Sequence, residues 1–147
     1  ETSMPDATYN DQNIFAKILR GELPCIKVYE DDHTIAFMDI MPQADGHVLV
    51  LPKESAAELF DLSDEAASAA IRTTRKLARA VRAAFTPPGI AIFQLNGSAA
   101  GQTVPHVHFH VLPRYSDTPL QPHARVQADS DKLKAHAEKI IAALQAE

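Results

Sequence analysis

Three histidines that alternate with apolar residues, His106-Val-His-Phe-His-Val111, constrain the fold of this chain more than any other feature. Successive side chains of a β-strand point to opposite faces, so the pattern predicts a strand over 105–113 with all three imidazoles on one face. Val107, Phe109 and Val111 would then face a core. Three titratable rings are costly to bury without polar partners, so we expect a polar group or a ligand to cover this face.

Composition excludes several classes of protein. The chain has 147 residues, 46% of them hydrophobic and 22% charged, as in a single globular domain. The lone Cys25 excludes an intrachain disulfide and a cysteine-based zinc framework. A net charge of −5 predicts no binding to DNA, RNA or an anionic membrane. Because no membrane-length apolar run and no leader sequence is present, we expect a cytoplasmic protein.

Periodicity and turn residues predict an α+β fold, in which about five strands form an antiparallel sheet with helices packed on it. The predicted strands cover 26–30, 34–39, 47–52, 90–95 and 105–113. The predicted helices are a short one near 14–19, a capped turn from Ser55 to Phe60, a long one from Ser63 to Pro87, and one over 131–145 capped by Ser130. On the long helix we expect Ala67, Ala70, Ile71, Thr74, Leu77, Val81 and Phe85 to form the apolar stripe.

The chain shows no linker that would divide it. We predict a flexible arm over 1–12, one domain over 13–114 and an extension over 115–147, extended from 116 to 127 and ending in the last helix. The basic residues of the long helix fall mostly off its apolar stripe and are interpreted as a solvated face: Arg72, Arg75, Lys76, Arg79 and Arg82.

Three interpretations of the histidines compete. They could be incidental polar positions on the wet face of a strand. They could bind a metal, but three rings spread over about 13 Å do not converge easily on one ion. Further ligands would then have to come from His47, Asp39 or Asp45.

The third interpretation is phosphate chemistry without a metal, which we favour. The loop that precedes the histidines contains Gly97 and Gly101, whose surroundings leave backbone N–H groups free to face an anion. Gln102 and Thr103 add side-chain donors. A neutral imidazole can attack phosphorus near pH 7, because its ordinary pKa is about 6.5.

The segment Gly101-Gln-Thr-Val-Pro-His-Val-His-Phe-His-Val-Leu-Pro-Arg114 resembles the signature of the histidine triad (HIT) superfamily of nucleotide hydrolases and transferases. Upstream segments resemble its histidine triad nucleotide-binding (Hint) branch: Ile14-Phe-Ala-Lys-Ile18, Gly21-Glu-Leu-Pro24, Glu30-Asp-Asp32, Ala36-Phe-Met-Asp-Ile40, Pro42-Gln-Ala44 and His47-Val-Leu-Val-Leu-Pro-Lys53. These segments cover most of 14–114 in order.

The resemblance implies a role for each histidine. His108 corresponds to the family's nucleophile, and His110 to the histidine that contacts the α-phosphate and the leaving group. His106 and His47 would form a polar relay that orients the nucleophile. The implied phosphate contacts are Asn96, Gly101, Gln102 and Thr103, the implied ribose contact is Asp39, and the implied base pocket is Ile14, Phe15, Ile18, Phe37 and Ile40.

The implied activity is hydrolysis of a purine nucleotide or AMP conjugate, such as a nucleoside phosphoramidate, through a nucleotidyl-histidine intermediate. The resemblance implies a homodimer with sheets joined across the interface and no cofactor. Some relatives hold zinc with a Cys-x-x-Cys pair where this chain reads Asn13-Ile-Phe-Ala16, so we expect no metal. Two alternatives stay open: a dinucleoside polyphosphate hydrolase, because Val111-Leu-Pro-Arg114 also occurs in the fragile-histidine branch, and a nucleotide-binding interaction protein.

Overall fold

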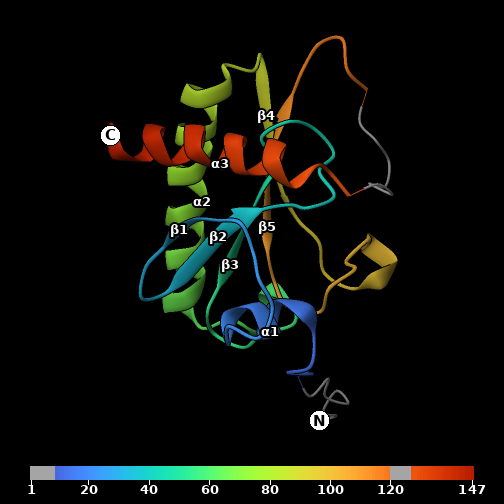
Figure 1. The fold of residues 1–147 in the computed structure, drawn as a ribbon. Coiled ribbons are helices and arrows are strands. Elements are labelled where there is room, and N and C mark those ends of the chain that lie inside the picture. Colours follow the sequence, from blue (N-terminus) through green and yellow to red (C-terminus); the bar gives the residue numbers. More distant parts are fainter. Residues whose placement is uncertain (1–8, 120–126) are drawn as a thin grey trace.

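A five-stranded antiparallel sheet in the order β1-β2-β3-β5-β4 forms the centre of the structure (Figure 1). The computed structural model describes residues 9–119 and 127–147. Its strands are β1 (Lys27–Glu30), β2 (Thr34–Met38), β3 (Val48–Pro52), β4 (Gly89–Gln94) and β5 (Phe109–Arg114). Its helices are α1 (Ile14–Leu19), α2 (Asp64–Phe85) and α3 (Ser130–Gln145), with 3₁₀ turns η1 (Leu59–Asp61) and η2 (Ser98–Ala100). The prediction of an α+β fold with five antiparallel strands is confirmed.

The sheet separates two hydrophobic clusters. Helix α2 lies along one face, α3 lies across α2, and both pack with Met38, Val48 and Val50 (Figure 1). On the other face Phe15 of α1 packs with Phe37 and Leu49. All residues of β2 and β3 are therefore buried, which explains why β3 is a continuous apolar run without alternation.

The long helix α2 begins and ends where local chemistry predicts. The Ser63 hydroxyl accepts the Ala66 N–H, and Thr86 adopts a left-handed conformation with φ 44° before two prolines. The prediction for Ile71 is wrong, because its side chain is 52% exposed. The buried stripe runs through Ala70 and Leu77, and Ile71 lies beside it, towards β4.

The predicted helix from Ser55 to Phe60 is also wrong. Only a 3₁₀ turn forms, and its capping box pairs Glu58 with Asp61. The preceding carbonyls have other partners: Ala56 accepts the Val107 N–H at 2.9 Å and Ala57 accepts the Gln102 side chain at 2.7 Å. These bonds attach the segment to the triad and leave it no helical ladder.

The histidine segment itself departs from the predicted strand over 105–113, because β5 begins only at Phe109. Pro105 has no N–H to donate to a ladder, and the His106 N–H turns back to the Val104 carbonyl at 2.9 Å. His106 and His108 therefore lie before the strand, and only His110 lies within it. Val107, Phe109 and Val111 are buried, as predicted.

The C-terminal helix α3 begins one residue earlier than predicted, and its cap is Asp129, whose carboxylate accepts the Lys132 N–H. The prediction of Ser130 as the cap is wrong. Parts of the predicted arm (1–8) and of the predicted extended segment (120–126) lie outside the described residues. Among the described helices, none combines the length and the apolar character that a membrane crossing needs.

Candidate functional site

Four histidines meet where β3 and β5 run side by side. His47 directly precedes β3, and His110 of β5 is in register with Leu49 of β3 and Phe93 of β4. The ring centroid of His110 lies 5.2 Å from that of His47 and 5.0 Å from that of His108. The rings of His47, His108 and His110 are thus close together, and His106 contacts His108 through its backbone carbonyl.

One hydrogen-bond chain fixes the proton positions of His47 and His110. The Gln43 backbone N–H donates to His47 Nδ1 at 3.1 Å, so the proton of a neutral His47 ring is on Nε2. His47 Nε2–H then donates to His110 Nδ1 at 3.0 Å. The His110 proton is consequently on Nε2, where it can be donated to a ligand.

A second chain fixes His106 and His108. His106 Nε2–H donates to the Pro52 carbonyl at 2.8 Å, and its Nδ1 accepts the Tyr9 hydroxyl at 2.6 Å. The His106 carbonyl in turn accepts His108 Nδ1–H at 2.7 Å. A neutral His108 therefore carries its lone pair on Nε2. Within the described residues this nitrogen has no hydrogen-bond partner.

Burial keeps the four rings uncharged. It lowers the pKa of His47 to about 4 and that of His110 to about 3, with repulsion from His108 as the next cause for both. Burial also lowers the pKa of His106 and of His108. At neutral pH the site therefore offers neutral imidazoles, which can attack an electrophile or donate N–H groups.

Asp39 behaves in the opposite sense. Burial raises its pKa to about 6, although the Met41 N–H that it accepts at 2.9 Å opposes the rise. Its Oδ2 lies 3.5 Å from His47 Nδ1, so the predicted ribose contact adjoins the histidines. Above pH 6 this side chain is mainly an ionised acceptor.

The loop of small residues is braced by its own amides. Gln102 Oε1 accepts the Gly97 N–H at 2.7 Å, and Gln102 Nε2 donates to the carbonyls of Ala57 and Val104. The Asn96 amide bonds the Leu59 N–H and the Gln94 side chain. Thr103 is exposed, and Gly101 has φ 103°, a left-handed conformation that suits glycine. Phosphate contact by these residues stays a prediction.

The five residues predicted to hold a base are divided between core and surface. Phe15 and Phe37 are buried in edge-to-face contact at 5.6 Å, with Ile18 packed against them. Ile14 and Ile40 are 51% and 44% exposed, so they present apolar surface to solvent. Phe15, Phe37 and Ile18 therefore contribute to the core, whereas Ile14 and Ile40 are accessible to a ligand.

Aromatic side chains complete the site. Phe15 meets His108 edge-on with centroids 4.9 Å apart, and Phe93 stacks on His110 at 4.3 Å. Sequence reasoning missed Phe93 and Tyr9, as well as the backbone groups of Gln43 and Pro52. The register of β4 against β5 could have indicated Phe93, but nothing in the aperiodic N-terminal segment indicated Tyr9.

One group in the described part of the chain has the donor types of a metal site: Asp39, His47 and His110 each offer a ligand atom, and these atoms lie within 4.8 Å of one another. Both His47 nitrogens are already engaged, with the Gln43 N–H and with His110. A metal ion would have to break one of those bonds. Asp45, the third residue considered as a further metal ligand, instead forms an ion pair with Lys132 at 3.2 Å.

The structure is therefore an α+β protein whose candidate site combines uncharged, hydrogen-bonded histidines with a loop held by the side-chain amides of Asn96 and Gln102. The family model described as the HIT domain matches residues 20–117, and the chain belongs to this family. It is 44% identical over 102 residues to Protein hit of Bacillus subtilis, covering 69% of this chain and 70% of that protein.

Two further relatives support the assignment. The chain is 42% identical over 101 residues to adenosine 5'-monophosphoramidase hnt1 of Schizosaccharomyces pombe, covering 69% of this chain and 73% of that protein. The crystal structure of a Hit-like protein from Bartonella henselae is similar with a TM-score of 0.86 and 45% identity, over 92% of this chain and 99% of that chain.

The Tyr9→Phe variant should lose about 1–3 kcal/mol of unfolding free energy, because buried His106 Nδ1 would lose its donor. Urea unfolding of both proteins measures the change. The matched control is Tyr115→Phe, whose hydroxyl donates to the Asp45 carbonyl at the surface and should cost less than about 0.5 kcal/mol. Equal losses of unfolding free energy in the two variants would contradict a stabilising hydrogen bond from Tyr9 to His106.

Acidification from about pH 7.5 to about pH 5 should lower the thermal midpoint. The unfolded histidines take up protons below their ordinary pKa, whereas the folded rings resist protonation until the pH nears 4 for His47 and 3 for His110. Asp39 acts oppositely, since its raised pKa makes the folded state the better proton acceptor between about pH 4 and pH 6. The Asp39→Asn variant should therefore lose thermal stability more steeply on acidification. Calorimetry measures the midpoints of both proteins, and a midpoint that does not change with pH would contradict the prediction.

Proposed function

We propose that this protein hydrolyses AMP conjugates, in particular adenosine phosphoramidates, through a nucleotidylated His108. The observation that carries the proposal is the orientation of His108, whose Nδ1–H is fixed by the His106 carbonyl while Nε2 bonds none of the described residues. The relative named adenosine 5'-monophosphoramidase supports this choice of substrate.

The reaction has two displacements at the α-phosphorus. First, His108 Nε2 bonds to phosphorus, the P–N bond to the amine breaks, and the amine leaves with a proton from solvent. Second, water attacks phosphorus, the P–Nε2 bond breaks, AMP leaves and one water proton returns to solvent. During both steps His110 Nε2–H donates a hydrogen bond to a phosphoryl oxygen, oriented by the bond from His47.

Nucleotide binding would use the neighbouring surface. Asp39, ionised above about pH 6, is suited to accept hydrogen bonds from ribose hydroxyls. The exposed side chains of Ile14 and Ile40 are suited to contact a purine base. Thr103 and the backbone of Gly101 are suited to contact the phosphate.

Replacing the nucleophile tests the proposal. His108→Asn should reduce the rate of release of AMP from adenosine phosphoramidate by about 1,000-fold or more, because the covalent route is lost. His33→Asn, a change on the exposed β1–β2 hairpin, should leave that rate within about twofold. Chromatography of released AMP measures both.

Other outcomes select the alternatives. Preserved turnover in His108→Asn would overturn the covalent mechanism. AMP binding without turnover in the unaltered protein would favour an interaction protein. Faster cleavage of diadenosine polyphosphates than of the phosphoramidate would favour a dinucleoside polyphosphate hydrolase.

We further propose that two copies pair through β4 and α2. Strand β4 is an edge of the sheet, and edge strands carry unpaired backbone groups. Beside it, Ile92 of β4 and Ile71 of α2 are 48% and 52% exposed and line a groove with Ala78 and Ile90, which Arg75, Arg79 and Arg82 also line. A two-fold axis beside β4 would extend the sheet and bury both grooves at once.

The variant Ile92→Asp should weaken this dimer at least about tenfold, because it would bury a carboxylate in the interface. Sedimentation velocity over a dilution series measures the change. The control Phe60→Asp alters an apolar side chain that is 76% exposed on η1, away from the groove, and should leave the mass unchanged. A monomeric unaltered protein at micromolar concentration would contradict the proposal.

A further inference from the structure

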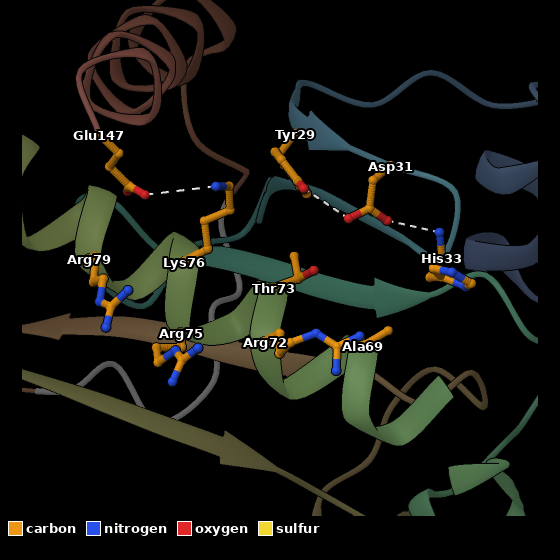
Figure 2. Close-up of a pocket in the computed structure, with 10 residues that line it drawn as sticks. All are labelled: Tyr29, Asp31, His33, Ala69, Arg72, Thr73, Arg75, Lys76, Arg79 and Glu147. Atoms are coloured by element: carbon orange, nitrogen blue, oxygen red, sulfur yellow. Dashed lines mark hydrogen bonds and ion pairs between the residues drawn. The ribbon is translucent and has the colours of Figure 1, made fainter. Parts of the chain in front are cut away.

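Helix α2 presents basic side chains to a cleft (Figure 2). This helix covers the face of the sheet opposite to the one on which Phe15 contacts His108. The cleft has a volume of about 270 Å³ and lies between α2, the β1–β2 hairpin and the end of α3. It is lined by Tyr29, Asp31, His33, Ala69, Arg72, Thr73, Arg75, Lys76, Arg79 and Glu147. Four of the five basic residues of α2 thus line this cleft and Arg82 does not, while Arg75 and Arg79 also line the groove beside Ile92.

The cleft contains more basic than acidic side chains. Arg72, Arg75, Lys76 and Arg79 follow one another at the spacing of helix neighbours, where like charges repel. Among the described residues the only ion pair that these four make joins Lys76 Nζ to a Glu147 carboxylate oxygen, at 3.8 Å (Figure 2). A set of three unpaired guanidinium groups on one helix face is a ready phosphate receptor.

The other carboxylate of the cleft is already engaged. Asp31 accepts the Tyr29 hydroxyl and the His33 N–H, each at 2.8 Å (Figure 2). It also accepts the N–H and the hydroxyl of Thr34. These bonds hold the hairpin in place and lower the pKa of Asp31, so it stays an acceptor tied to its own turn. The buried hydroxyls of Thr34 and Thr73 bond each other at 2.8 Å and thereby connect β2 to α2 beneath the cleft.

We propose that this cleft binds a linear oligophosphate anion. Arg79 lies seven positions after Arg72, which is roughly 10.5 Å along the helix and suits several linked phosphates better than one. The net charge of −5 on the whole chain and the small volume of the cleft disfavour a nucleic acid. Glu147 contacts the same Lys76 ammonium group, so its carboxylate competes with the ligand.

Calorimetric titration with sodium tripolyphosphate tests the proposal in the unaltered protein, independently of any hydrolysis. We expect saturable binding of one anion per chain, and at least about tenfold weaker binding of orthophosphate. Equal affinity for the two anions, or no saturable binding, would overturn the proposal.

Variants locate the site. Arg72→Gln/Lys76→Gln should weaken tripolyphosphate binding about tenfold or more, and Arg75 and Arg79 are left intact because they also line the groove beside Ile92. The control Lys134→Gln/Lys139→Gln makes the same change of charge on α3 and should shift affinity by less than about twofold.

Glu147→Gln gives a test that does not depend on loss of function. Removing the competing carboxylate should tighten binding by about two- to threefold. Unfolding curves of the double variant establish that it is folded, and relief of repulsion along α2 should keep its midpoint from falling. Unchanged binding in the double variant, equal loss in the control, or weaker binding in Glu147→Gln would each refute the cleft as the site.

Discussion

The hydrogen bond from His108 Nδ1–H to the His106 carbonyl, at 2.7 Å, is the interaction on which the histidine site depends. It forms because His106 lies before the first residue of β5, so that its carbonyl is not engaged in the hydrogen bonds of the sheet. Backbone groups hold the surrounding rings in the same way, through the Gln43 N–H and the Pro52 carbonyl. The proton positions of the site are therefore properties of the backbone path.

Burial supplies the second requirement of the site, which is neutrality. An imidazolium in place of His108 would have no lone pair on Nε2, and a protonated His110 could no longer accept the His47 Nε2–H at its Nδ1. Packing against Phe15 and Phe93 keeps both rings in a poorly solvated environment, and this environment disfavours the charged forms. The same environment makes Asp39 a weaker acid and sets the lower pH limit at which it is an ionised acceptor.

Much of the fold and of the site follows from local patterns. The alternation of histidines with Val107, Phe109 and Val111 predicts a core-facing set that is buried in the structure, and Ser63 predicts the beginning of α2. The errors lie where a distant partner decides. The segment from Ser55 forms no α-helix because its carbonyls bind the triad segment, and Ile71 is exposed because the sheet lies against the neighbouring stripe of α2.

The sequence alone determined the family, the candidate site residues and the order of the strands along the chain, because these depend on residue type and short-range spacing. Tertiary structure alone decided which nitrogen of each ring carries the proton and which arginines meet at one cleft. It also brought Tyr9 to His106, residues 97 positions apart in the chain. Such relations arise between segments that are distant in sequence, and no local periodicity encodes the distance or the angle at which two side chains finally meet.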